Sequence, residues 1–279
     1  MNLYKLAKIY SIILIISGIS LFSCSNDAVP KKGITKYVIT RIVRPNDLED
    51  RFIYLNDTLI EKAEIYNKGQ LISIEKINRT NTNSLSLSSY AYPKFTEIQT
   101  IKSFTFSNGI INKISIVNSS NLNLPFQYDF EFDDQSRLKH YEYYNFYPNG
   151  IGDTHYLIED AEVSWLGTGL QALITIPQPF TYPPVIYSTF TVQSEGEKGE
   201  SIWSKLSQEA LATIIFQDMH IIEYFVPNRI IGIESESYGS YTFDDFSYDV
   251  NGNPISVRRT NTGSGKVDNF KFEWKRVDL

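Results

Sequence analysis

The stretch Phe126-Gln127-Tyr128-Asp129-Phe130-Glu131-Phe132 decides the fold class of this 279-residue chain. Aromatic and polar residues alternate in it without a break. Side chains of a β-strand point alternately to its two faces, so the pattern predicts a strand with one buried face and one wet face. Phe270 to Lys275 repeats the pattern near the C-terminus.

Turn residues separate the alternating stretches. Asn108-Gly109, Asn149-Gly150 and Asn251-Gly252 are Asn-Gly pairs, which tolerate the positive φ angles that tight hairpins require. We therefore expect an all-β fold, with antiparallel sheet or sheets built from consecutive hairpins and at most one short inserted helix. The pattern leaves open whether the sheet stays open, folds into a sandwich or closes into a barrel.

Two segments depart from the alternating pattern. Residues 201–213 begin with a serine that could cap a helix, and Ile202, Leu206 and Ala210 follow at helical spacing, so a short helix is predicted there. Residues 79–91 are rich in Ser, Thr and Asn and are predicted to form an exposed loop.

The first two dozen residues have the form of an export signal. Lys5 and Lys8 precede a short apolar stretch, and Leu21-Phe22-Ser23-Cys24 resembles a bacterial lipobox, in which the cysteine receives the lipid. This predicts a lipoprotein signal peptide at 1–23, a lipidated cysteine with its tether at 24–35, and a β-rich domain at 36–279. Acyl chains such as palmitate on Cys24 would then hold the protein to a membrane. A serine rather than aspartate at position 25 favours the outer membrane, by resemblance to enterobacterial lipoproteins, and leaves its periplasmic or surface face undecided.

Charge and cysteine content exclude some functions. The chain has a net charge of −6, and removal of residues 1–23 takes away two lysines and makes it more acidic. Nucleic-acid binding requires clustered basic residues, so no nucleic-acid partner is expected. Cys24 is the only cysteine, and its use for the lipid leaves none for disulfides.

A degenerate repeat recurs along the chain: an aromatic residue, a turn rich in Asn, Asp or Gly, then aliphatic residues that start a new strand. Its copies begin at Tyr66, Phe106, Phe132, Tyr224 and Tyr248. The Tyr248-Asp249-Val250-Asn251-Gly252 copy resembles the YD repeat of Rhs-type proteins, and similar units occur in uncharacterised lipoproteins of Bacteroidota. The resemblance implies a long sheet of stacked hairpins and no catalytic residues.

The search for catalytic or metal-binding motifs is negative. His140, His155 and His220 have no zinc-site spacing, and neither a nucleophile elbow nor a phosphate-binding loop occurs. Asp249, Asn251 and Asn253 begin like an EF-hand loop, but proline follows where glycine is required. We therefore expect no enzyme activity, no catalytic residues, no metal site and no cofactor.

Residues 140–147 carry the densest group of aromatic side chains. On a strand, Tyr141, Tyr143 and Tyr147 would share one face, with Tyr144 and Phe146 on the other. Core packing is the more common role of such residues, and an exposed row that stacks on a ligand is the alternative. The candidate ligand-binding residues are therefore Tyr141, Tyr143, Tyr147 and Tyr182.

Three functions are compatible with the sequence. The first is a non-catalytic binding module of the cell envelope, whose partner is a glycan or another envelope protein. The second is a structural subunit of an outer-membrane assembly. The third is a hydrolase with no recognisable motif.

Overall fold

The computed structural model describes residues 35–118, 125–148, 153–177, 185–195, 200–215, 221–237 and 239–278. Residues 1–34 lie outside this range, and with them the predicted signal peptide, Cys24 and the tether. These predictions stay untested by the structure.

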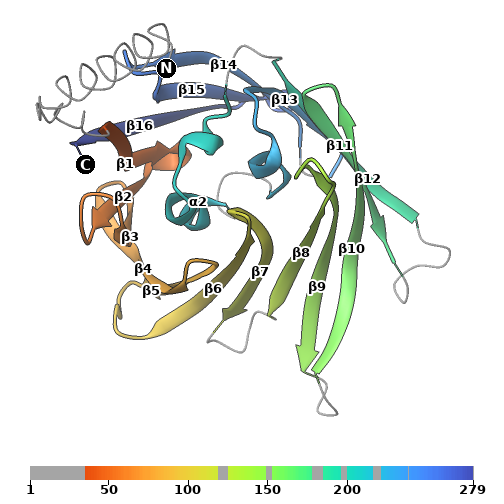
Figure 1. Cartoon of the computed structure of the whole chain (residues 1–279), viewed down its shortest axis with the longest axis horizontal. Helices are drawn as coiled ribbons and strands as arrows, with labels where there is room; N and C mark the ends of the chain where they lie inside the picture. The colour runs from red at the N-terminus through yellow and green to blue at the C-terminus, as the bar shows by residue number, and fades with distance from the viewer. Residues whose placement is uncertain are drawn as a thin grey trace, which may run out of the picture. The chain divides into compact units, whose positions relative to one another are not determined.

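The described residues form sixteen antiparallel β-strands, each paired with the next along the chain and closed into a barrel by β1 and β16 (Figure 1). The strands are β1 (Thr35–Arg44), β2 (Leu48–Tyr54), β3 (Ile60–Asn67), β4 (Gln70–Asn81), β5 (Ser84–Ala91), β6 (Ile98–Ser107), β7 (Ile110–Asn118), β8 (Phe126–Phe132), β9 (Leu138–Pro148), β10 (Asp153–Leu166), β11 (Gly169–Ile176), β12 (Val185–Ser194), β13 (Ile230–Ser235), β14 (Tyr241–Tyr248), β15 (Pro254–Asn261) and β16 (Val267–Asp278). A 3₁₀ turn, η1 (Pro45–Asp47), joins β1 to β2. The predicted all-β, hairpin-built fold is confirmed, and closure removes the exposed strand edges that an open sheet would present.

Strand β8 shows how the alternating sequence is used. Phe130 is buried and pairs with Tyr141 of β9, while Glu131 beside it is exposed and pairs with His140. The aromatic positions of β8 therefore face the barrel interior and its polar positions face outward. The prediction of a strand with one buried face is confirmed.

The hairpin turns follow the chemistry of their residues. Asn108 and Gly109 both have positive φ, at 51° and 80°, and they connect β6 to β7 in two residues. The turns after β8 and β14 instead close around an aspartate. Asp133 accepts hydrogen bonds from the backbone of Gln135 and Arg137, as Asp249 does from the backbone of Asn251 and Asn253.

The loop predicted at residues 79–91 is wrong. These residues complete β4 and form β5, with only a tight turn at Thr82 and Asn83 between them. Leu85 and Leu87 are buried and alternate with serines that lie on the other face. These two leucines give β5 its buried face, and the neighbouring strands β4 and β6 contribute further apolar side chains to the core.

Between β12 and β13 the chain leaves the barrel wall. It forms a 3₁₀ turn η2 (Trp203–Lys205), the helix α2 (Gln208–Ile214) and a second 3₁₀ turn η3 (Ile221–Phe225). The predicted helix exists, but its start is wrong. Ser207 is the N-cap, since its hydroxyl accepts from the backbone of Ala210, whereas Ser201 accepts from Trp203 in the preceding turn.

This segment, residues 200–215 and 221–226, lies inside the ring of strands, and we call it the inner segment (Figure 1). Its contacts reach strands far apart around the barrel. Trp203 lies against Phe270 and Phe272 of β16. The ring centre of Phe225 lies 4.9 Å from that of Phe130 on β8. The side of the sheet that packs on the inner segment therefore faces inward, and the apolar core fills the barrel.

Three ion pairs are buried on the inward side of the strands. They are Arg44–Asp50 at 2.6 Å, Lys102–Glu75 at 2.8 Å and Arg259–Asp268 at 2.9 Å. The hydroxyl of Ser89 adds a hydrogen bond to Glu75. Buried charges are tolerated only when they are paired and hydrogen-bonded, so Arg44–Asp50 and Arg259–Asp268 each favour one register of two neighbouring strands, and Lys102–Glu75 links β6 to β4 across β5.

The outward faces of the strands carry most of the remaining charge. Outward positions include Lys62, Glu64 and Tyr66 on β3, Gln127, Asp129 and Glu131 on β8, and Asn269, Lys271, Glu273 and Lys275 on β16. Large exposed apolar residues are mostly scattered, and Ile101 and Val117, which are partners between β6 and β7, are an exception. Transmembrane barrels show the opposite alternation, with an apolar outer band and a polar interior.

Ion pairs continue across the outer wall from β16 through β1 to β2. Arg41 pairs with Glu273 at 2.7 Å and with Glu49 at 2.8 Å, and Glu49 also pairs with Arg51. These contacts lower the pKa of Glu49, chiefly through the hydrogen bond from Arg41. No helix among the described residues is long and apolar enough to cross a membrane.

Candidate functional site

Two of the tyrosines singled out in the sequence, Tyr141 and Tyr143, lie on the inward face of β9. Tyr141 is fully buried, and Tyr143 is half-buried and stacks on Tyr128 with ring centroids 4.7 Å apart. The side chain of Tyr147 and the whole of Tyr182 lie outside the described residues. Of the two roles considered, the structure gives Tyr141 core packing, and a ligand role for this group stays a prediction.

Another group of aromatic side chains lines a groove at one end of the barrel. In a meander of consecutive hairpins, alternate turns share an end, so the turns after β6, β8, β10 and β14 all lie at the same end of the barrel. The inner segment packs against this end, which we call the capped end. A groove of about 470 Å³ separates the inner segment from the turns, within the size range of small-ligand sites.

The apolar floor of the groove comes from both sides. The inner segment contributes Tyr224 and Phe225, whose rings lie 5.0 Å apart, and β10 contributes Trp165. The indole N–H of Trp165 donates to the backbone oxygen of Leu138 at 2.8 Å, which fixes the orientation of the ring. Phe225 is held in turn against Phe132, 5.6 Å away.

The rim of the groove is polar. The β8–β9 turn supplies Gln135, Ser136 and Arg137, and α2 supplies Gln208, which donates to the backbone oxygen of Gly109 at 2.7 Å. The guanidinium of Arg137 lies 5.6 Å from the ring centre of Trp165 and also pairs with Asp133. Hydrogen bonds from the backbone and side chain of Arg137 lower the pKa of Asp133, so the turn carries a charged carboxylate.

Burial raises the pKa of Tyr224, and a backbone hydrogen bond at Ile111 partly opposes this effect. The phenol therefore stays neutral and can offer its ring to the groove. The site as a whole combines flat aromatic surfaces with amide, hydroxyl and guanidinium groups around them. That combination binds and orients a ligand, and it contains no nucleophile paired with a base.

Sequence reasoning missed this site. Trp165 is about 60 positions from the adjacent pair Tyr224-Phe225 along the chain, and neither stands in a long aromatic stretch. The one usable signal was the degenerate repeat, whose copies at Phe132 and Tyr224 contribute the rim turn and part of the floor.

No family model matches the sequence, and no curated protein matches it. Similar solved structures include a porin-like protein from Bacteroides uniformis ATCC 8492 and a porin-like protein from Bacteroides vulgatus ATCC 8482. Each is 8% identical to this chain, with a TM-score of 0.47, and each alignment covers 85% of this chain and 98% of the other.

These findings overturn the expected relation to YD-repeat lipoproteins. No family model, of a YD repeat or any other kind, matches the sequence, and the strands close into a barrel instead of stacking as a long sheet. The repeated pattern has a local cause. At Tyr66, Phe106, Phe132 and Tyr248, an aromatic residue stands at the end of one strand and a turn that contains Asp or Gly leads to the next strand. The Tyr224 copy does not share this role, because Tyr224 lies in η3.

The histidines and acidic residues do not assemble into a metal site in the described part of the chain. His140 lies on the outer wall, where its Nε2 is 2.7 Å from a carboxylate oxygen of Asp160. His220 and the side chain of His155 lie outside the described residues. The predicted pairing of Asp153 with His155 is therefore untested.

Proposed function

We propose that this chain is a lipid-anchored protein of the cell envelope that binds a ligand without catalysis in the groove at the capped end. The observation that carries the proposal is the groove itself, with three aromatic side chains on its floor and amide groups on its rim. The envelope location rests on the lipobox-like sequence at Cys24, and the outer membrane is the proposed site of the anchor.

Conduction through the barrel is not part of the proposal. The inner segment buries Ile202, Trp203, Leu211 and Ile214 against the strands, and the interior is an apolar core instead of a polar channel. The outward charges support a position of the barrel beside the membrane instead of within it, because a membrane-spanning barrel has an apolar outer band. A lipid on Cys24 would then be the only attachment that the proposal requires.

A glycan is the ligand class that fits the groove best. The apolar face of a pyranose ring can pack on Trp165 or Phe225, and its hydroxyl groups can reach amide donors and acceptors such as Gln135 and Gln208. A wholly apolar ligand would leave the polar rim without partners. An anionic glycan would meet both Arg137 and Asp133, so a neutral oligosaccharide is favoured.

Binding can be tested by titrating the purified protein with neutral oligosaccharides and following tryptophan fluorescence, to which Trp165 would contribute. The variant Gln135→Ala removes a rim amide, and we expect affinity to fall about two- to tenfold, as for the loss of one neutral hydrogen bond. Gln171→Ala on the outer wall of β11 is the matched control. Absence of saturable binding across the panel, or equal losses in both variants, would contradict the proposal.

A structural subunit of an outer-membrane assembly is the second candidate. One observation favours it: Ile101 and Val117 are partners in the β6–β7 register, and both are exposed on the outer wall, at 38% and 49%. Adjacent exposed apolar residues suit a protein contact. Cross-linking in intact cells would distinguish the candidates, since a subunit gives a defined adduct that Val117→Lys abolishes, whereas a glycan-binding protein gives none.

A further inference from the structure

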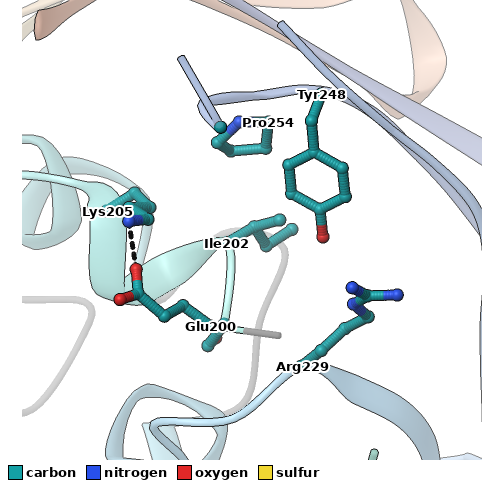
Figure 2. Close-up of a pocket in the computed structure, with 8 residues that line it drawn as sticks. Glu200, Ile202, Lys205, Arg229, Tyr248 and Pro254 are labelled. Carbon is teal, nitrogen blue, oxygen red and sulfur yellow. Dashed lines mark ion pairs between the residues drawn. The ribbon is translucent and has the colours of Figure 1, made fainter. Parts of the chain in front are cut away.

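A second pocket lies at the capped end, and it shares no lining residue with the groove. It has a volume of about 260 Å³ and is formed by the start of the inner segment and the β14–β15 turn (Figure 2). The residues that matter for its chemistry are Glu200, Lys205, Arg229 and Tyr248, with Ile202 and Pro254 as apolar wall.

The hydroxyl group of Tyr248 is the feature of this pocket that the fold does not explain. Its oxygen is buried, and no hydrogen-bond partner for it exists within the described part of the chain. Figure 2 shows the hydroxyl pointing across the pocket toward Arg229. Buried polar groups in folded proteins are nearly always hydrogen-bonded, so the Tyr248 hydroxyl, which the described residues leave without a partner, is a group that a ligand in the pocket would satisfy.

Arg229 is held in place by its neighbours. Its guanidinium carbon lies 5.2 Å from the ring centre of Phe246 and 5.5 Å from that of Tyr248. One guanidinium nitrogen pairs with Glu195 at 3.0 Å, and the Glu195 side chain is 46% exposed. The cation is thus positioned by aromatic rings, while its acidic partner is exposed to solvent.

Lys205 contributes a second cation on the other side of the pocket. It pairs with Glu200, whose side chain is 65% exposed (Figure 2). Exposed ion pairs contribute little free energy because water and salt screen them. An incoming anion can therefore replace either glutamate at small cost.

The turn that forms the opposite wall is rigid. Asp249 accepts hydrogen bonds from the backbone of Asn251 and Asn253 and from the side-chain amide of Asn253, and Gly252 has a φ of 79°. Desolvation raises the pKa of Asp249, but these hydrogen bonds together outweigh it and lower the pKa. The charged carboxylate of Asp249 therefore belongs to the turn and is not available to a ligand. The position of Tyr248, which ends β14 just before this turn, is fixed as a result.

We propose that this pocket binds an oxyanion, the carboxylate or phosphate group of a small ligand, between the Tyr248 hydroxyl and the Arg229 guanidinium, with Lys205 as the second cation. The hydroxyl donates one hydrogen bond to the anion and the guanidinium donates another, as in charge-assisted sites generally. The volume admits only such a small group. This proposal is independent of the glycan groove, since the two sites share no residue.

The test is a titration of the purified mature protein with sodium phosphate and, separately, sodium acetate, with sodium chloride at matched ionic strength as reference. The melting temperature should rise with one or both oxyanions relative to chloride, because a ligand that binds only the folded state stabilises it. The phosphate and acetate arms distinguish the two kinds of oxyanion.

Tyr248→Phe is the deciding variant. It should lower the affinity for the oxyanion at least about tenfold, as for the loss of a hydrogen bond to a charged group. Its melting temperature in chloride should not fall, because the hydroxyl has no partner in the described chain to lose. Tyr66→Phe is the matched control, since that hydroxyl bonds Glu64 on the outer wall at 2.8 Å and should not affect anion binding.

Arg229→Gln gives a second measurement and should abolish the response to the oxyanion. If neither anion raises the melting temperature above chloride, the proposal is overturned. It is equally overturned if wild type, Tyr248→Phe and Arg229→Gln respond alike, because the anion then binds elsewhere.

Discussion

Removal of the lipid anchor that we propose on Cys24 should release this barrel from membranes completely. The perturbation is a protein that begins at Ser25 and therefore lacks Cys24. The reasoning depends on the outer wall, where charged side chains occupy the positions that lipid would contact in a spanning barrel. A barrel that depended on its strands for attachment would stay bound without the cysteine.

The magnitude follows from the outward cations of a few strands. Lys271 and Lys275 of β16, Arg41 of β1, Arg51 of β2 and Lys62 of β3 all face outward. Each Arg or Lys on the lipid face of a barrel costs about 2–4 kcal/mol at the bilayer midplane. Even at half of that value, because some would lie near an interface and several are ion-paired, the five together cost about 5–10 kcal/mol.

The assay is flotation with liposomes on a density gradient. The protein that begins at Ser25 should stay at the bottom of the gradient. It should also remain monodisperse without detergent. In electrophoresis it should not show the heat-dependent mobility shift of outer-membrane barrels. The lipidated protein is the control and should float. Flotation of the lipid-free protein at high ionic strength would refute the inference that the charged wall faces water.

Three further predictions concern stability. Lys102→Met should lower the free energy of unfolding by about 3–5 kcal/mol, because it leaves the buried carboxylate of Glu75 without its cation, and adding Glu75→Leu should restore most of the loss in urea denaturation. Trp203→Ala should cost about 3–5 kcal/mol, since this side chain is only 3% exposed, whereas Leu55→Ala, at 68% exposed, should change the stability by no more than about 0.5 kcal/mol. Because the pKa of Asp133 is lower in the folded state, this residue stabilises the fold above its unfolded pKa of about 3.9, and that stability is lost as the pH falls through the folded pKa. Asp133→Asn should therefore reduce the fall of the melting temperature with decreasing pH. An unchanged fall would contradict this prediction.

Local features of the chain were predictable because they depend on neighbouring residues. The alternation in Phe126 to Phe132 identified β8 and its buried face, and Asn108-Gly109 identified a two-residue hairpin. Both follow from the period of a strand and from the φ angles that Asn and Gly tolerate. The helix in the inner segment was predicted from its spacing, and its start was misplaced because two serines compete as caps within one short stretch.

The repeat shows where local similarity misleads. Phe132-Asp133 and Tyr248-Asp249 form the same aspartate-centred turn, which is a real local regularity. A shared turn does not determine a shared family, because any antiparallel hairpin can use it. Whether such hairpins stack or close depends on strand twist and on the contacts of the last strand with the first.

By itself, the sequence determined the strand class, the hairpin order, the sidedness of strands such as β8, and the export-signal pattern that ends at Cys24. The tertiary structure decided closure, because pairing of β1 with β16 joins residues more than 200 positions apart and leaves no local signature. It also decided that the inner segment fills the barrel and that Trp165 meets Tyr224 and Phe225 in one groove. The physical reason is the same in each case. Side-chain alternation indicates which residues are buried, whereas their contact partners depend on the three-dimensional path of the whole chain.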